Sequence, residues 1–134
     1  MRFTVELEPF LRTIEEVKDK VGNRLPGNMA RLIASRGRVF IEGKVTTAEI
    51  DAAVTEEGQC KVPMEKFLKL LKTRTDPSIT VEADTAWLRI GASTIPISGY
   101  SAYAVEPPRF QIYLANEAGL VPSKFMLSCL AHEP

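Results

Sequence analysis

The sequence predicts an α+β domain made of two repeated strand–helix–three-strand units, with two helices on one face of antiparallel sheet. Residues 5–14 (VELEPFLRTI) recur at residues 62–71 (VPMEKFLKLL), and four positions are identical. Segments with a hydrophobic period of two also alternate with segments of helical period. A length of 134 residues with 45% hydrophobic content suits one domain with a single core. Internal self-similarity of this kind indicates a duplicated structural unit.

The first unit is predicted over residues 1–57. Apolar side chains alternate through residues 2–7, which indicates a strand. Pro9 suits the first turn of a helix, and the apolar residues that follow at helical spacing predict a helix that ends at Gly22–Asn23. Three strands are then expected, at residues 28–35, 38–42 and 46–54.

The second unit repeats this order over residues 58–108. A short strand at residues 59–62 leads to Pro63, which marks the start of a helix from Met64 to about Arg74. The apolar stripe of this helix follows an i, i+3, i+4, i+7 spacing and consists of Met64, Phe67, Leu68 and Leu71. Three more strands are expected, at residues 78–83, 86–91 and 93–98.

Residues 109–134 form a C-terminal extension, for which we expect a strand over 109–115 and a short helix. The stretch from Gly119 to Phe125 echoes residues 62–67 with one residue missing. It is therefore either the start of a third, truncated unit or a helix that caps the core of the domain.

Charge and cysteine content narrow the class of protein. Seventeen basic and seventeen acidic residues give a formal net charge of zero, so a nucleic-acid partner requires a local basic patch. No segment approaches the roughly 20 apolar residues of a membrane span. Cys60 and Cys129 are the only cysteines and lack the spacing of a metal site or a disulfide framework. We expect a cytoplasmic protein with no metal, cofactor or membrane contact.

Catalysis finds no support in the residue pattern. The one histidine, His132, lies two residues from the end of the chain, where segments are usually poorly ordered. Acidic pairs such as Glu15–Glu16 are adjacent in sequence, and adjacent side chains do not converge on a helix. Glycine-rich phosphate loops are absent. We therefore expect a protein that is not an enzyme.

Four segments resemble, in order and spacing, one domain of the bacterial sliding DNA clamp, the β subunit of DNA polymerase III. They are Met1-Arg2-Phe3-Thr4-Val5 before an amphipathic helix, Val21-Gly22-Asn23-Arg24, Val62-Pro63-Met64-Glu65-Lys66-Phe67 and Ile95-Pro96-Ile97-Ser98-Gly99-Tyr100. The resemblance covers about residues 1–108. Clamp subunits carry three such domains and pair into a ring around duplex DNA, whereas this chain has one full domain. Leu25-Pro26-Gly27 also stands where the family has a longer loop.

The resemblance implies a DNA-binding surface on the helices. Arg24 falls on the DNA-contacting arginine of the family, and the second helix carries the remaining candidates, Lys66, Lys69, Lys72 and Arg74, against a single acid, Glu65. Lysines on one arc of a helix contact phosphates without reading base sequence. The alternative is an ordinary solvated lysine face. The first helix carries mixed charge and is close to neutral.

Three hypotheses for function follow. The first is a single-domain clamp homologue that binds duplex DNA without sequence specificity as a replication or repair accessory. Encircling DNA would then need a homo-oligomeric ring of about six copies joined through edge strands. The second is an interaction module that binds replication proteins without DNA, which the zero net charge favours. The third is a decoy that occupies the proteins that bind clamps.

Overall fold

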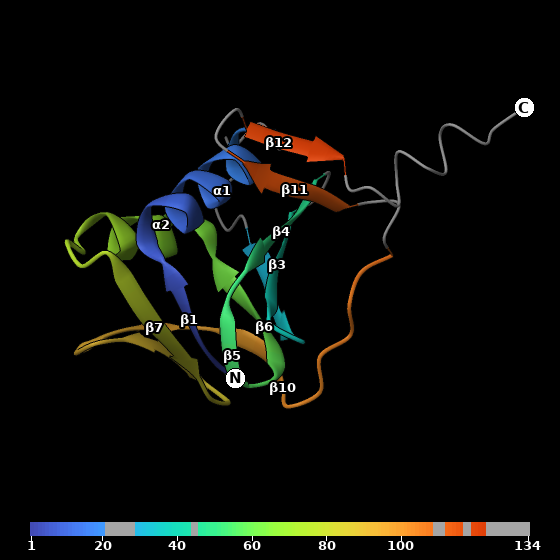
Figure 1. Ribbon diagram of the computed structural model, residues 1–134. Coiled ribbons are helices and arrows are strands. Elements are labelled where there is room, and N and C mark those ends of the chain that lie inside the picture. The colour runs from blue at the N-terminus through green and yellow to red at the C-terminus, as the bar shows by residue number, and fades with distance from the viewer. Residues whose placement is uncertain (21–28, 44–45, 109–111, 117–118, 123–134) are drawn as a thin grey trace, which may run out of the picture.

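The computed structural model describes residues 1–20, 29–43, 46–108, 112–116 and 119–122. In these parts the chain folds into two helices and two sheets (Figure 1). The first unit contains β1 (Arg2–Glu6), α1 (Leu7–Lys20), β2 (Met29–Ser35), β3 (Arg38–Glu42), β4 (Thr47–Asp51) and β5 (Ala53–Glu56). The second contains β6 (Gly58–Pro63), α2 (Met64–Lys72), β7 (Ser78–Ala83), β8 (Trp87–Ile90), β9 (Ser93–Pro96) and β10 (Ser98–Ser101).

The two units exchange strands, so neither forms a sheet alone. One sheet has the order β5-β1-β7-β8-β9, and in the other the order of the equivalent strands is β10-β6-β2-β3-β4. The first strand of each unit thus pairs with the second strand of the other: β1 with β7, and β6 with β2. This reciprocal pairing relates the units by an approximate two-fold symmetry. Because each sheet contains strands of both units, the two units form one domain rather than two tandem domains.

The last expected strand of each unit is broken, which corrects the prediction of three continuous strands per unit. Residues 46–54 divide at Ala52 into β4 and β5, and residues 93–98 divide at Ile97 into β9 and β10. The two halves of each segment belong to different sheets. At both breaks a backbone N–H donates to an earlier turn, from Ala52 to the Gly37 carbonyl and from Ile97 to the Ala86 carbonyl, each at 3.0 Å. Hydrophobic alternation continues through the break, so the sequence pattern does not reveal it.

The core lies between the two sheets and beneath the two helices. Phe3 on β1, Phe10 on α1 and Phe67 on α2 are fully buried. Their rings form a chain of edge-to-face contacts, with centroids 5.9 Å apart from Phe3 to Phe10 and 5.9 Å apart from Phe10 to Phe67. Edge-to-face geometry adds about 0.5–1.5 kcal/mol per pair to the apolar burial. The Phe10 ring therefore connects the first strand and both helices.

Local contacts fix where the helices begin and end. The Leu7 N–H at the start of α1 donates to the Pro77 carbonyl at 2.9 Å, which ties this helix to the segment before β7. At the end of α2, the Thr73 hydroxyl donates to the Leu70 carbonyl at 2.7 Å. α2 thus ends at Lys72, two residues before the expected position, while the expected end of α1 at Gly22–Asn23 lies outside the described residues.

The C-terminal extension adds a hairpin to one sheet. β11 (Ile112–Asn116) pairs in parallel with β4, and β12 (Gly119–Pro122) pairs antiparallel with β11. Figure 1 shows this hairpin beside β4 and next to α1. The strand expected over 109–115 is therefore present from residue 112. Residues 119–122 are a strand, and the remaining positions for a short helix lie outside the described residues.

The expected fold class, an α+β domain of two repeated units with both helices on the same side, is confirmed. The helices lie next to each other above the sheets in Figure 1. The described part of the chain contains no helix that is long and apolar enough to cross a membrane.

Replacing Phe10 with alanine tests the importance of the aromatic chain. Because Phe10 is the middle ring and is fully buried, Phe10→Ala should lower the free energy of unfolding by about 3–5 kcal/mol. Denaturant unfolding followed by circular dichroism measures the change. Tyr103→Ala is the control, since this side chain is 82% exposed and its loss should change stability by no more than about 0.5 kcal/mol. Equal losses in the two variants would contradict the proposed core.

Candidate nucleic-acid interface

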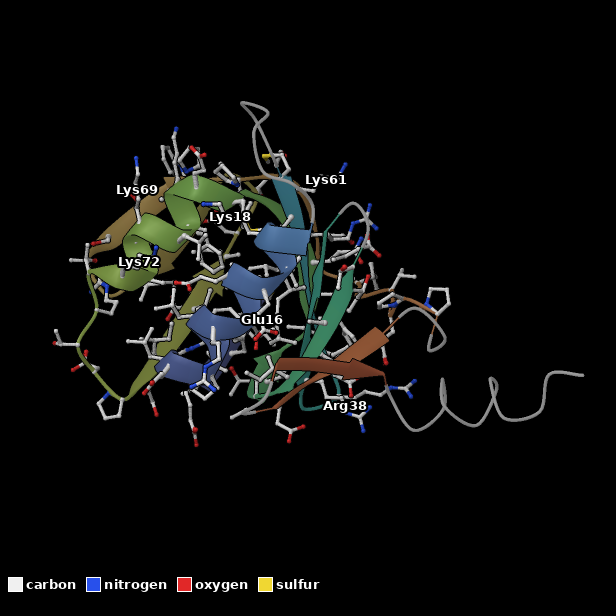
Figure 2. The ribbon with its side chains drawn as sticks, turned by 90° about the horizontal axis from the view of Figure 1, so that it is seen from above. Glu16, Lys18, Arg38, Lys61, Lys69 and Lys72 are labelled. Carbon is white, nitrogen blue, oxygen red and sulfur yellow. The ribbon has the colours of Figure 1, made fainter. Side chains whose placement is uncertain are left out.

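The helix α2 separates apolar and basic side chains onto opposite faces. Its four expected core residues are all buried. Lys66, Lys69 and Lys72 are exposed, and they recur every three residues along the opposite face. With a rise of about 1.5 Å per residue, the three Cα atoms span roughly 9 Å of the helix. We call this set the α2 lysine face, and Figure 2 shows its Lys69 and Lys72 on the helical side of the molecule.

Ion pairing distinguishes this face from other basic surfaces. On the outer face of the β1 sheet, Arg2 and Arg89 both contact Glu82, with the Arg2 pair at 3.5 Å. The hydrogen bond from Arg89 is the main cause that lowers the pKa of Glu82 below its ordinary value of 4.5. Arg31, Arg36 and Arg38 likewise have carboxylate partners. Nearby carboxylates therefore largely neutralise the positive charges of these arginines.

Four lysines in the described residues lack such partners: Lys18, Lys61, Lys66 and Lys69. Three of them belong to the helices, Lys18 to α1 and the other two to the α2 lysine face. Lys61 is on β6, and Figure 2 shows it apart from Lys69 and Lys72. Among the described side chains, three of the four lysines without a carboxylate partner therefore lie on the two helices.

Lys72 differs from its two neighbours because it contacts α1. Its Nζ lies 3.7 Å from a carboxylate oxygen of Glu15, and both side chains are about half exposed. An exposed pair of this kind contributes only about 0–1 kcal/mol. Sequence reasoning missed this contact, because only the packing of the helices brings Glu15 next to Lys72.

The described side chains of α1 carry charges of both signs. Arg12 lies 3.7 Å from Glu8, an i,i+4 pair on the same helix. Figure 2 shows Glu16 on the flank of α1 away from α2. Of the acidic side chains of α1 that the structure describes, Glu15 alone forms an ion pair with the α2 lysine face, through Lys72.

Arg74 occupies a different environment from the lysines. Its guanidinium Nη2 donates to the Ser93 hydroxyl at 2.6 Å, and the side chain is partly buried. Gly91, at φ +60°, makes room for the group: a Cβ there would lie 3.0 Å from Arg74 Nη1. Arg74 thus connects the end of α2 with the β8–β9 turn. Arg24, the remaining sequence candidate, lies outside the described residues.

The described residues offer little for other chemistry. No group of three or more histidine, cysteine, aspartate or glutamate side chains is placed to hold a metal ion in this part of the chain. Burial raises the pKa of the Cys60 thiol to about 12, so the thiolate is scarce at neutral pH. A cavity of about 490 Å³ lies beside β4 and another of about 340 Å³ on the outer face of the β1 sheet. None of the three lysines of the α2 lysine face lines either cavity.

Comparison with known proteins establishes the fold. No family model matches the chain, and no curated protein matches it. Among solved structures, the Helicobacter pylori β clamp with carprofen matches at a TM-score of 0.63 and 15% identity, over 81% of this chain and 33% of that one. The Pseudomonas aeruginosa DNA polymerase III β subunit matches at 0.62 and 19%, over 81% and 33%. Caulobacter crescentus pol III β matches at 0.60 and 18%, over 73% and 29%.

These matches define the class of the domain. At 15–19% identity they establish a common fold, and this fold is that of a sliding-clamp domain. The resemblance inferred from the sequence is thereby confirmed at the level of fold. The chain spans about a third of the length of the clamp chains that it matches.

A stability measurement separates Arg74 from the lysines. Arg74→Ala should lower the free energy of unfolding by about 1–3 kcal/mol, because the hydrogen bond from its charged group to Ser93 is lost. Lys69→Ala removes an exposed side chain and should change stability by at most about 0.5 kcal/mol. Thermal and denaturant unfolding of both variants provide the comparison. Indistinguishable unfolding curves would exclude a structural role for Arg74.

Proposed function

We propose that this domain binds duplex DNA without sequence preference through its helical side. The α2 lysine face supplies the principal contacts, and the concentration of unneutralised lysines on this side is the observation that carries the proposal. Ammonium groups on flexible stems attract phosphate oxygens but do not recognise bases. Contacts of this kind let a protein move along DNA.

Arg24 and Arg74 complete the proposed set of DNA-binding residues, and each is included for a different reason. Arg24 is retained because it falls on the DNA-contacting arginine of the clamp family in the sequence resemblance. Arg74 already hydrogen-bonds Ser93, so its main contribution is to hold the end of α2 against the sheet. Its charge adds to the positive potential of the helical side.

The domain is proposed to act as a replication or repair accessory in the cytoplasm and not as an enzyme. The similar structures are DNA polymerase III β clamps, and the Helicobacter pylori clamp has been solved with a DNA ligase peptide. That clamp matches this chain at a TM-score of 0.60 and 17% identity, over 81% of this chain and 35% of that one. By analogy, replication proteins are candidate partners, and several copies could surround DNA with their helices inward.

A second candidate function is that of an interaction module that binds replication proteins without DNA. A decoy that occupies clamp-binding proteins is one variant of this function. The acidic residues on α1 favour it, because Glu15 engages Lys72 and Glu16 lies on the opposite flank (Figure 2). Negative charge there weakens attraction to phosphate. The two functions differ in whether DNA affinity depends on the α2 lysine face.

Neutralising the α2 lysine face tests DNA binding directly. In the variant Lys66→Gln/Lys69→Gln/Lys72→Gln, the negative slope of log K against log salt should become less steep by about 2.7, or about 0.9 per lost phosphate contact. Fluorescence anisotropy with a labelled duplex at several salt concentrations measures the slope. Affinity should fall equally for duplexes of unrelated sequence, since no base contact is removed.

Two single variants form a matched control for this experiment. Lys69→Gln should make the negative slope less steep by about 0.9. Lys61→Gln removes the same charge from an exposed lysine on β6 and should leave the slope unchanged. Unchanged DNA affinity in the folded triple variant would reject the proposal and favour the interaction module.

The contact between Glu15 on α1 and Lys72 on α2 predicts a variant with increased DNA affinity. Glu15→Gln removes the partner of Lys72 and should raise DNA affinity about two- to fivefold, equivalent to roughly 0.4–1 kcal/mol for an exposed ion pair. Glu16→Gln loses the same charge on the flank away from α2 and should have a smaller effect (Figure 2). Anisotropy titrations at one low salt concentration compare the two. Equal increases would show that Glu15 acts only through net charge.

A further inference from the structure

The outer face of the β1 sheet carries a row of polar side chains that crosses all five strands. Side chains alternate along a strand, so the neighbours of the buried Phe3 and Val81 lie on the outer face. Cross-strand pairing aligns one residue from each strand into this row: Glu56 on β5, Arg2 on β1, Glu82 on β7, Arg89 on β8 and Thr94 on β9. All five line the cavity of about 340 Å³ on this face, which we call the Trp87 cavity.

Trp87 gives the cavity an exposed aromatic wall. It is the only tryptophan of the chain, and 52% of its surface is exposed. The large apolar side chains that remain exposed among the described residues are Trp87, Tyr103 and Val105, and of these only Trp87 lines either cavity. No ring contact or cation–π contact within the described residues involves Trp87. An exposed ring beside polar groups is typical of an interaction surface.

Reciprocal hydrogen bonds hold Asp84 next to Trp87. The Asp84 N–H donates to the Trp87 carbonyl at 3.0 Å, and the Trp87 N–H donates to Asp84 Oδ1 at 3.0 Å. The Ala86 N–H donates to the same oxygen at 3.0 Å and is the main cause that lowers the pKa of Asp84 below its ordinary value of 3.8. The Asp84 carboxylate is therefore charged at neutral pH, and its other oxygen can accept from a guest.

The cationic groups of the Trp87 cavity already have partners within the protein. Arg2 and Arg89 share the Glu82 carboxylate. The α-amino group of Met1 donates to the Ala83 carbonyl at 3.3 Å, and Met1 is buried. An anionic guest would have to compete with Glu82 for its guanidinium groups.

Two of the three carboxylates in the cavity are available to a guest. Glu56 and Asp84 are exposed and form no ion pair with the described residues. The three carboxylates and three cationic groups balance in formal charge, so the available groups decide which guest fits. A cationic guest meets two carboxylates without an ion-pair partner and an exposed indole.

A guanidinium group matches this arrangement better than an ammonium group. Its planar face stacks on an aromatic ring, and its N–H donors form a fork that fits a carboxylate. Charge-assisted hydrogen bonds of this kind are about twice as strong as neutral ones. A volume of about 340 Å³ is at the lower end for ligand sites, which suits one long side chain rather than a cofactor.

We propose that the Trp87 cavity is a docking site for an arginine side chain that projects from a partner protein, with the guanidinium on the Trp87 ring and hydrogen-bonded to Asp84. Tryptophan and arginine are enriched among the residues that dominate binding energy at interfaces. The lysines of the α2 lysine face do not line this cavity, so a partner docked here leaves them accessible. The inference goes beyond the proposed function and does not depend on DNA binding.

Tryptophan fluorescence tests the inference directly, because Trp87 is the only tryptophan. The probe is the blocked peptide acetyl-Gly-Arg-Gly-amide, titrated into the full chain at low salt. Its citrulline counterpart has a similar shape without the charge and is the matched control ligand. The arginine peptide should change the emission saturably, and the citrulline peptide should bind about tenfold more weakly. A glutamate peptide should produce no saturable change.

Substitutions in the protein locate the binding site. Asp84→Asn keeps an oxygen for the Ala86 and Trp87 N–H groups and loses only the charge, so it should weaken binding of the arginine peptide about five- to tenfold. Asp76→Asn removes the same charge from an exposed residue outside the cavity and should leave binding unchanged. Trp87→Leu should abolish binding, followed by saturation-transfer NMR of the peptide, and this variant decides the matter if Asp84→Asn does not fold.

Any of three results overturns the inference. They are equal affinities for the arginine and citrulline peptides, tighter binding of the glutamate peptide, and a folded Asp84→Asn variant that binds as well as Asp76→Asn. DNA affinity of Asp84→Asn, measured by anisotropy, should equal that of Asp76→Asn. The α2 lysine face is tested with DNA and the Trp87 cavity with peptides, so each proposal can fail while the other holds.

Discussion

The exchange of strands between the two repeated units is the constraint on which the rest of the structure depends. Because β1 pairs with β7 and β6 pairs with β2, each unit completes the sheet of the other. The helix that follows each first strand is thereby placed on the same side as its counterpart. The Phe3, Phe10 and Phe67 rings then fill the space between them. The α2 lysine face and the mixed-charge surface of α1 are adjacent as a consequence of this arrangement.

The two repeated units differ in the charge of their helices and in the strands at their edges, so the surface of the domain is asymmetric. Both helices bury an apolar face in the common core, so selection for packing constrains them alike. Their exposed faces are free to differ: α2 is basic, whereas α1 carries acids such as Glu15 and Glu16. The edges differ in the same way, with Pro96 on one and an added hairpin beside the other. An approximately symmetric fold thus carries an asymmetric surface.

Several elements could be predicted because their signals are local. The helical spacing of Met64, Phe67 and Leu71 indicates both the existence of α2 and its buried face, and the strand at Arg38–Glu42 has the predicted bounds. The breaks at Ala52 and Ile97 could not be predicted, because a strand that changes sheets keeps the same alternation of apolar residues. The environment of Arg74 was equally hidden, since its partner Ser93 lies nineteen residues away on another element.

The sequence by itself determined the duplicated unit, the two amphipathic helices and the basic character of the second, because periodicity and charge are properties of short segments. Only the tertiary structure decided how the two units interlock, which lysines remain without a carboxylate partner, and that Glu15 on α1 reaches Lys72. Only the tertiary structure decided, too, that the hairpin lies beside β4, while β9 has no further strand beside it among the described residues. The physical reason is that strand pairing and ion pairing join residues far apart in the chain, and a single sequence carries no local record of such contacts.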